Sequence, residues 1–144
     1  MDAARLAFAL VREEGIRLKP YRDSVGVWTV GVGHNLESGG ISRAAAMQIL
    51  EDDIANVCRD LDARLPWWRT LDEVRQQVVA DMAFNLGVSG LLGFKNTLGF
   101  VKQKRWNEAA AGMLVSLWAK QVGRRATVLA EMMRTGVDPF DGVA

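Results

Sequence analysis

The sequence predicts an α+β fold that is mostly α. Near the N-terminus, a short run from Val27 to Gly33 alternates in the period-2 manner of a strand. A long helical pattern then covers residues 42–65, and helical segments punctuated by glycine fill the rest of the chain. We therefore expect one domain with a small β-sheet lobe (about residues 15–50), a linking helix (about 42–65) and a larger helical lobe (about 66–144) that includes the N-terminal helix.

The N-terminal helix has clear start and stop signals. Asp2 can serve as its N-cap, and Gly15 supplies the left-handed conformation that ends many helices. Apolar residues such as Leu6 recur between them at helical spacing. Glu13 and Glu14 therefore fall in the last turn, and helix position alone does not choose between them.

A turn containing Asp23 leads into the strand-type run. If that run is one strand, Thr29, Gly31 and Gly33 lie on one face, and this open face has room for a flat polar ligand such as a sugar ring. Two carboxylates that flank an open floor are what glycoside hydrolysis requires. The alternative is an acidic helix end, a turn aspartate and a buried strand without chemistry, as found in many small domains.

The pattern over residues 42–65 begins at Ser42, a suitable N-cap, and stops before Pro66. It carries one apolar stripe, formed by Met47, Leu50, Ile54, Val57, Cys58, Leu61 and Leu65. We expect Cys58 to be a core thiol. As the only cysteine in the sequence, it cannot form an intramolecular disulfide.

Further helices are expected over residues 71–86, 97–104, 106–115 and 126–134. Their expected core residues are Val74, Val78, Ala80, Met82, Leu86, Met113, Leu114, Leu117, Leu129 and Met132. The five tryptophans could stack on sugars, but packing in the core is the favoured interpretation for each of them.

Composition and charge exclude several classes of protein. The 144 residues are 49% hydrophobic and carry a net charge of +1, which argues against a protein dominated by a polyanionic partner. Residues 95–134 nevertheless hold eight Lys and Arg against two Glu; they could form a basic surface for an anionic partner or simply be solvated helix faces. The N-terminus does not read as a signal peptide, and no stretch is apolar enough for a membrane span.

Cofactor chemistry is not expected. One histidine and one cysteine, far apart, make neither a zinc site nor a cysteine protease dyad, and the acidic residues lack the spacing of a calcium loop. The run Gly31-Val32-Gly33 lacks the third glycine and the following helix of a dinucleotide site. We therefore expect no metal and no cofactor.

Motifs along nearly the whole chain resemble the bacteriophage lysozyme family, the endolysins that cut peptidoglycan glycan strands. In the N-terminal part the matching residues are Glu14-Gly15, Leu18-Lys19, Tyr21, Asp23, Gly26, Thr29, Gly31, Gly33 and His34. Downstream they are Leu71 to Arg75, Phe84 to Gly87, Gly93-Phe94, Lys104 to Ala110, Trp118, Gln121, Arg125 and Arg134 to Gly136. This resemblance implies a two-lobed phage-lysozyme-like fold and a single lysozyme-like catalytic domain.

The resemblance implies three catalytic residues. Glu14 matches the proton donor of the family, Asp23 its second catalytic carboxylate, and Thr29 the hydroxyl that helps to position the attacking water. Asn35, Phe84 and Thr97 match positions that line the sugar cleft.

Other family features are supporting or altered. Gln121 and Arg125 match the family near Trp118, and the match suggests that Arg125 pairs with Glu14. His34, to which we assign no chemical role, has Asp53 as its candidate partner. Gly112 stands where relatives can carry a substrate-contacting asparagine, and the segment between residues 36 and 42 looks shortened.

The function implied is an endolysin muramidase that hydrolyses the β-1,4 bond between N-acetylmuramic acid and N-acetylglucosamine for host lysis. We expect a monomer that binds peptidoglycan glycan strands without nucleic acid or stable membrane association. It would remain in the host cytoplasm until a holin opens the membrane, and then act in the periplasm and cell wall. The alternatives are a non-catalytic wall-binding module and a nucleic-acid binder that uses the basic residues 95–134, which would bind DNA with steep salt dependence.

Overall fold

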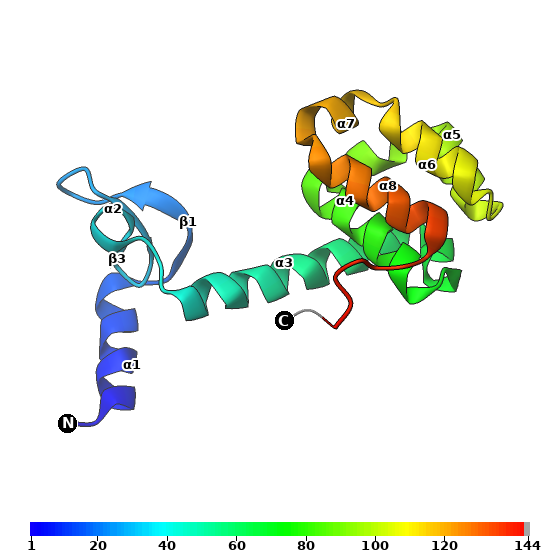
Figure 1. Cartoon of the computed structure of the whole chain (residues 1–144). Helices are drawn as coiled ribbons and strands as arrows, with labels where there is room; N and C mark the ends of the chain where they lie inside the picture. Colours follow the sequence, from blue (N-terminus) through cyan, green and yellow to red (C-terminus); the bar gives the residue numbers. More distant parts are fainter. Residues whose placement is uncertain (143–144) are drawn as a thin grey trace. The chain divides into compact units, whose positions relative to one another are not determined.

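The computed structural model describes residues 1–142 and confirms a mostly helical α+β fold (Figure 1). These residues contain eight α-helices, one 3-10 helix and three strands. The chain divides into two compact units, Met1–Ile49 and the part that begins at Leu50, with the boundary inside helix α3 (Arg43–Arg64). Each unit is described by itself below.

The first unit opens with helix α1 (Ala3–Glu14), and both of its predicted end signals are confirmed. The Asp2 side chain accepts hydrogen bonds from the backbone N–H groups of Ala4 and Arg5. Gly15 adopts φ 72° and donates its N–H to the Val11 carbonyl at 2.8 Å. These caps make Glu14 the last residue of α1.

A three-stranded antiparallel sheet follows, in the order β1 (Arg17–Arg22), β2 (Trp28–Gly31) and β3 (His34–Asn35). Thr29, on the central strand, pairs with Tyr21 on one side and with Asn35 on the other. The one-turn helix α2 (Leu36–Gly39) comes directly after β3, in the segment that looks shortened in the sequence.

The predicted single strand through Gly33 is wrong, because strand β2 ends at Gly31. Val32 and Gly33 form a turn, and the chain then reverses into β3. Gly31 has φ 69° and Gly33 has φ 63°, in the left-handed region that glycine adopts without the steric cost of a Cβ atom. As a sequence pattern, glycines at period 2 fit a strand and a hairpin equally well; here Gly31 ends β2 and Gly33 lies in the turn.

Helix α3 confirms the predicted helix over residues 42–65. Ser42 Oγ accepts a hydrogen bond from the Ala45 N–H at 3.1 Å, as expected for an N-cap. In the second unit, Leu61 and Leu65 are buried in the core, and Cys58 is a free thiol that packs against it.

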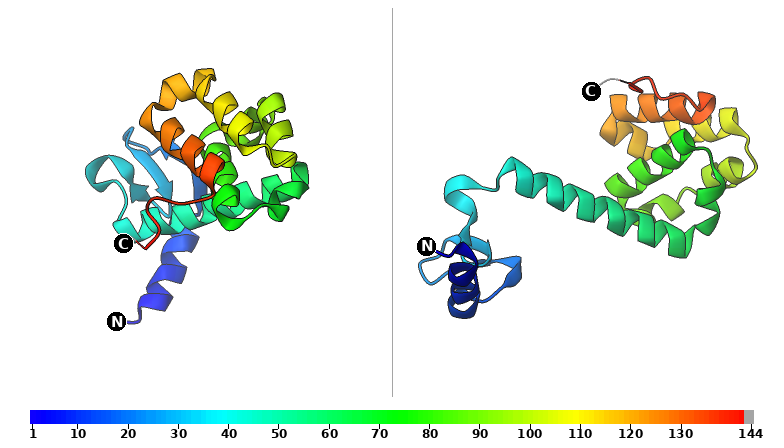
Figure 2. Two further views of the ribbon diagram at one scale, coloured as in Figure 1. Left: turned by 45° about the vertical axis from the view of Figure 1, so that its right-hand side comes forward. Right: turned by 90° about the horizontal axis from the view of Figure 1, so that it is seen from below.

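The second unit is helical throughout its described part. After the 3-10 helix η1 (Pro66–Thr70) come α4 (Glu73–Leu92), α5 (Lys95–Lys102), α6 (Trp106–Leu114), α7 (Leu117–Val122) and α8 (Arg124–Thr135). Both views in Figure 2 show α8 beside α4 and α6, with which it also makes contacts. The largest fully buried side chains are Leu61, Val78, Val79, Leu91, Val101, Met113 and Met133.

Helix α4 extends beyond the predicted segment 71–86 and bends at Gly87, whose φ of 74° is not helical. Within residues 1–142, no single helix combines the length and the apolar composition of a membrane span; α4 and α5 meet both criteria only as a pair bent by 107°.

Most predicted core residues are confirmed. Val78, Met82, Met113, Leu129 and Met132 are buried, and Val74, Ala80 and Leu86 pack against them. Leu114 and Leu117 were expected in the core but lie exposed, at the end of α6 and the start of α7, where the chain turns. Among the tryptophans, Trp68 and Trp118 are buried, Trp67 and Trp106 pack against the core, and Trp28 is 40% exposed.

Candidate active site

Glu14 lies against the glycine turn of the sheet. A Cβ atom built on Gly33 would lie 3.2 Å from Glu14 Oε2 and 3.3 Å from its carboxyl carbon. The turn therefore meets the carboxylate at a point where the backbone carries no side chain. The neighbouring Glu13 instead forms an ion pair with Arg12, with 3.6 Å between Oε1 and Nη2. Of the two acids in the last turn of α1, Glu14 is thus the one that contacts the sheet.

Asp23 is held by the backbone of the turn between β1 and β2. Its Oδ1 accepts hydrogen bonds from the N–H groups of Val25 and Val27, both at 2.9 Å. Its own N–H donates to the Val27 carbonyl, and Gly26 completes the turn at φ 86°. The turn therefore orients the carboxylate by one oxygen and leaves Oδ2 outside these hydrogen bonds.

Thr29 is 4% exposed on the central strand, and its Oγ1 donates to the Val27 carbonyl at 2.8 Å. A hydroxyl has one proton to donate and two lone pairs to accept with. Because the proton is used by Val27, the hydroxyl of Thr29 is oriented to accept a hydrogen bond from a small donor such as water. The single residue Val27 thus connects Asp23, through its N–H, with Thr29, through its C=O.

His34 and Asn35 make structural contacts in the same unit. The Nε2 atom of His34 lies 2.5 Å from the Gly40 carbonyl oxygen, which links β3 to the loop after α2. Asn35 Oδ1 accepts from the N–H groups of Glu37 and Ser38 and thereby caps α2. The pairing of His34 with Asp53 and the sugar contact of Asn35 remain predictions.

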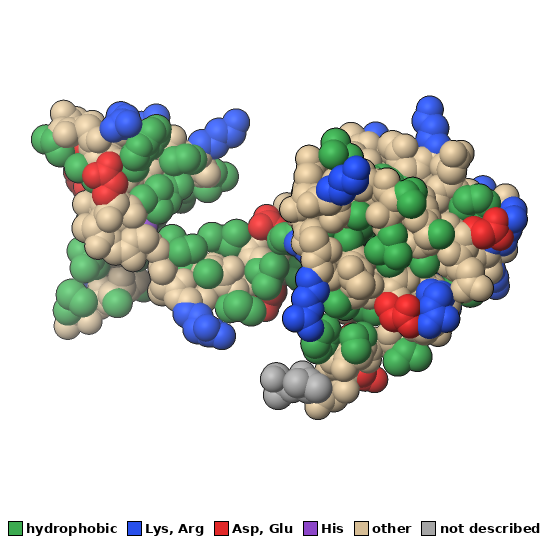
Figure 3. Space-filling view, turned by 45° about the horizontal axis from the view of Figure 1, so that its top comes forward, with side chains coloured by type: hydrophobic (Ala, Val, Ile, Leu, Met, Phe, Trp, Pro, Cys, Tyr) green, Lys and Arg blue, Asp and Glu red, His purple; other side chains and the backbone are tan. Residues whose placement is uncertain are grey.

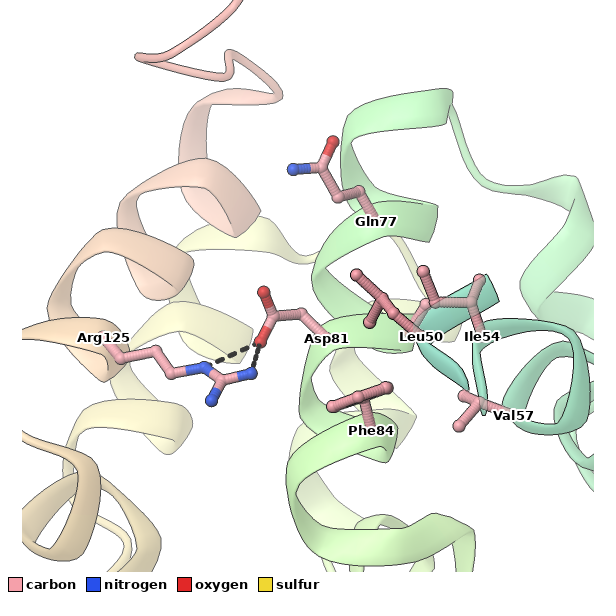
Figure 4. Close-up of a pocket in the computed structure, with 8 residues that line it drawn as sticks. Leu50, Ile54, Val57, Gln77, Asp81, Phe84 and Arg125 are labelled. Atoms are coloured by element: carbon pink, nitrogen blue, oxygen red, sulfur yellow. Dashed lines mark hydrogen bonds and ion pairs between the residues drawn. The ribbon is translucent and has the colours of Figure 1, made fainter. Parts of the chain in front are cut away.

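In the second unit, Phe84 and Arg125 line one pocket of about 370 Å³ (Figure 4). Arg125 donates from Nε to Asp81 Oδ1 at 2.8 Å and from Nη2 to the same oxygen. This pairing with Asp81 was not predicted. The predicted pairing of Arg125 with Glu14 remains a prediction.

The other predicted residues of the second unit are distributed over different surroundings. Asp53 borders a second hollow together with Phe84, so Phe84 takes part in both. Gln121 lines a separate hollow beside Trp118. Thr97 is only 7% exposed, and a Cβ atom on Gly112 would lie within 2.4 Å of its Oγ1.

Sequence reasoning missed two groups at these sites. Asp81 lies one helical turn before Phe84, so an i, i+3 projection of α4 would have placed both side chains on one face. The backbone of Val27 carried no signal, because a peptide group has the same donor and acceptor in every residue other than proline. In residues 1–142, no group of three or more His, Cys, Asp or Glu side chains is placed to hold a metal ion.

These features define a class of protein: a mostly helical enzyme with a small antiparallel sheet, whose turns position a helix-end glutamate and a turn aspartate. The chain matches the Phage lysozyme family over residues 11–134, and it belongs to that family. It is accordingly a glycoside hydrolase, a lysozyme-type enzyme that acts on peptidoglycan.

Three relatives illustrate the range of similar proteins. The chain is 32% identical to an endolysin of Salmonella phage P22 over 87% of both chains, and 24% identical to a probable T4-type lysozyme of Dictyostelium discoideum over 86% of this chain and 90% of that protein. It is also 28% identical to the pre-baseplate central spike protein Gp5 of Enterobacteria phage T4. That match covers 91% of this chain but only 28% of the spike protein.

Proposed function

We propose that this enzyme is a muramidase that hydrolyses the β-1,4 bond between N-acetylmuramic acid and N-acetylglucosamine. The observation that carries the proposal is the sheet that receives Glu14 at the Gly33 turn and also holds Asp23 and Thr29 through Val27. A pair of positioned carboxylates is what glycosidases use as general acid and as base or nucleophile. The resemblance to the phage lysozymes favours inversion, and the Thr29 hydroxyl can accept a hydrogen bond from the attacking water.

In the proposed mechanism, protonated Glu14 donates its proton to the glycosidic oxygen as the bond from that oxygen to C1 of the sugar breaks. A water molecule attacks from the opposite face of the sugar. Its oxygen forms a bond to C1, and its proton passes to the Asp23 carboxylate. Thr29 accepts a hydrogen bond from this water, because its own proton is donated to Val27. The product has the inverted configuration at C1.

The glutamate assignment can be tested with two neighbouring variants. Glu14→Gln removes the acidic proton and should lower the release of reducing ends from purified peptidoglycan by about 10²-fold or more, within the range for a lost general acid. Glu13→Gln is the matched control, because Glu13 lies in the same helical turn but pairs with Arg12, and it should keep its activity. Circular dichroism checks that both proteins fold. An active, folded Glu14→Gln protein would overturn the assignment.

The stereochemistry is a second test of the mechanism. Proton NMR of freshly released glycan ends should show the anomer opposite to that of the cleaved bond. Retention of configuration would instead indicate a covalent intermediate and would remove the water-positioning role proposed for Thr29.

We further propose that the enzyme serves host lysis as a monomer and reaches the wall through a holin. The endolysin relative, similar over 87% of its length, supports this role. The spike-protein relative supports an alternative in which such a domain forms part of a baseplate spike. Expression in a bacterial host should leave the cells intact until the membrane is permeabilised, and a native mass near 15.9 kDa should identify the monomer.

A nucleic-acid function has less support. Three of the basic residues in the stretch 95–134 have acidic partners: Arg105 with Glu108, Arg125 with Asp81, and Arg134 with Glu131. Figure 3 shows Lys and Arg side chains spaced apart over the visible face of the second unit. We expect no DNA binding at moderate salt.

A further inference from the structure

Arg22, the last residue of β1, has no role in the mechanism above, but it contacts the turn that holds Asp23. Its Nη1 donates a hydrogen bond to the Gly26 carbonyl oxygen at 3.1 Å. Its guanidinium carbon also lies 4.4 Å from the centre of the Trp28 ring, at the start of β2. The Arg22 side chain therefore joins β1 to the far side of the turn.

The Gly26 oxygen belongs to the same peptide group that donates a hydrogen bond to Asp23. This group joins Gly26 to Val27, and its N–H meets Asp23 Oδ1 at 2.9 Å. Because a trans peptide group is planar, its C=O and N–H point in opposite directions and turn together. The hydrogen bond from Arg22 to the oxygen therefore fixes the direction in which the N–H meets the carboxylate.

Gly26 is the position of the turn that most needs such a restraint. Its φ is 86°, in a region that glycine enters without steric cost, so the residue itself restricts the peptide group little. A Cβ atom added at Gly26 would meet nothing within 4 Å, so side-chain packing does not hold this position either. The hydrogen bond from Arg22 supplies a restraint that the local backbone lacks.

The contacts of Trp28 give the Arg22 guanidinium a fixed surface to lie on. The Trp28 N–H donates to Glu37 Oε1 at 3.2 Å, and the first turn of α2, which carries Glu37, is capped by Asn35. None of the ion pairs in residues 1–142 includes Arg22, so no carboxylate draws its guanidinium away from the turn. Arg22 is therefore placed by the Trp28 ring and the Gly26 oxygen.

The strand register separates Arg22 from the face of the sheet that carries Thr29. Arg22 pairs with Trp28, whereas the preceding residue, Tyr21, pairs with Thr29. Because successive side chains of a strand point to opposite faces, Arg22 and Trp28 lie on the face away from Thr29. Arg22 is thus placed to act on the turn and not on the water that Thr29 accepts from.

We propose that Arg22 is a positioning residue for Asp23 and acts through the peptide group between Gly26 and Val27. By holding the oxygen of that group, it keeps the N–H aimed at Asp23 Oδ1 and so keeps Oδ2 directed at the attacking water. The inference rests on the proposed function, since it takes Asp23 as the base of the muramidase reaction.

The first experiment compares Arg22→Met with Lys19→Met. Methionine removes the donor and the charge of Arg22, an exposed residue, and circular dichroism checks that both variants fold. The kcat for release of reducing ends from peptidoglycan should fall by about fivefold to tenfold in Arg22→Met, as expected for a small misplacement of a catalytic group. Its KM should not change, because Arg22 lies on the face away from Thr29. Lys19→Met removes an exposed cation from the same strand but outside the turn, and it should keep its kcat.

The second experiment follows the hydrogen bond to Asp23 without turnover. Hydrogen exchange of the Val27 N–H, measured by NMR, should be about fivefold to tenfold faster in Arg22→Met than in the parent and unchanged in Lys19→Met, because local opening of the turn exposes this amide. Unchanged exchange in Arg22→Met would overturn the inference, and so would an equal loss of kcat in both variants.

A double-mutant cycle separates the inference from the proposed function. Asp23→Asn keeps Oδ1 for the turn but removes the base, so Arg22→Met should change the remaining kcat by less than about twofold in that background. An equal factor in both backgrounds, or full kcat in Arg22→Met alongside a loss in Asp23→Asn, would overturn the role of Arg22 and leave the muramidase proposal standing. A folded and fully active Asp23→Asn would instead overturn the proposed role of Asp23, whatever the exchange of Val27 shows.

Discussion

Substitution of Gly33 by alanine tests whether the hairpin turn positions Glu14. At Gly33, the added Cβ would lie 3.2 Å from Glu14 Oε2 and 3.3 Å from its carboxyl carbon, closer than ordinary van der Waals contact. The carboxylate must therefore retreat by a few tenths of an ångström. A misplacement of about 1 Å can cost about 10²-fold in rate, so a shift of roughly a third of that should lower kcat by about fivefold.

Backbone strain must be separated from this contact, and Gly31 offers the control. Gly31, the last residue of β2 before the turn, has φ 69°, but a Cβ atom added there would meet nothing within 4 Å. Alanine at either position pays for a left-handed backbone, a cost of roughly 1–2 kcal/mol in the free energy of unfolding. Gly31→Ala should therefore be destabilised like Gly33→Ala but should retain the kcat of the parent.

The assay is the release of reducing ends at saturating peptidoglycan, combined with urea unfolding of each protein. The expected pattern is a similar loss of stability in both variants and a loss of kcat in Gly33→Ala alone. If the two variants lose kcat equally, or if folded Gly33→Ala is fully active, the turn does not position Glu14 and the reasoning is refuted.

Two further predictions concern stability. Hydrogen bonding from Arg69 lowers the pKa of Asp62 below its usual 3.8. A carboxylate with a lowered pKa stabilises the fold at pH values above its unfolded-state pKa, and this stabilisation is lost on acidification. Urea unfolding should therefore show Asp62→Asn less stable than the parent at neutral pH but equal to it well below about pH 4. A stability gap that persists in acid would show another origin. Gly136 has φ 71°, and a Cβ atom added there would lie 2.7 Å from Arg75 Nη1. Gly123 has a similar φ of 59°, but a Cβ atom added there would meet nothing within 4 Å. Gly136→Ala should therefore lower the melting temperature more than Gly123→Ala. Equal melting temperatures would exclude the Arg75 contact as a source of destabilisation.

Local signals account for what could be predicted of the fold. The cap at Asp2, the stop at Gly15 and the start at Ser42 depend on hydrogen bonds within a few residues, so the residue types at these positions identify them in the sequence. The apolar stripe of α3 likewise follows helical spacing, and its Leu61 is buried as that spacing predicts. The hairpin at Gly31 was missed because local spacing permits both a strand and a turn, and only pairing with β3 distinguishes them.

The candidate site divides in the same way. Short-range periodicity and turn chemistry were enough to predict an acid at a helix end, an acid in a turn and a hydroxyl in a strand. The contact of Glu14, rather than Glu13, with Gly33 became known from the folded chain, as did the hydrogen bond from Arg125 to Asp81, 44 positions away. Such contacts depend on how separate elements pack, and the separation of two residues along the chain does not indicate whether packing makes them neighbours.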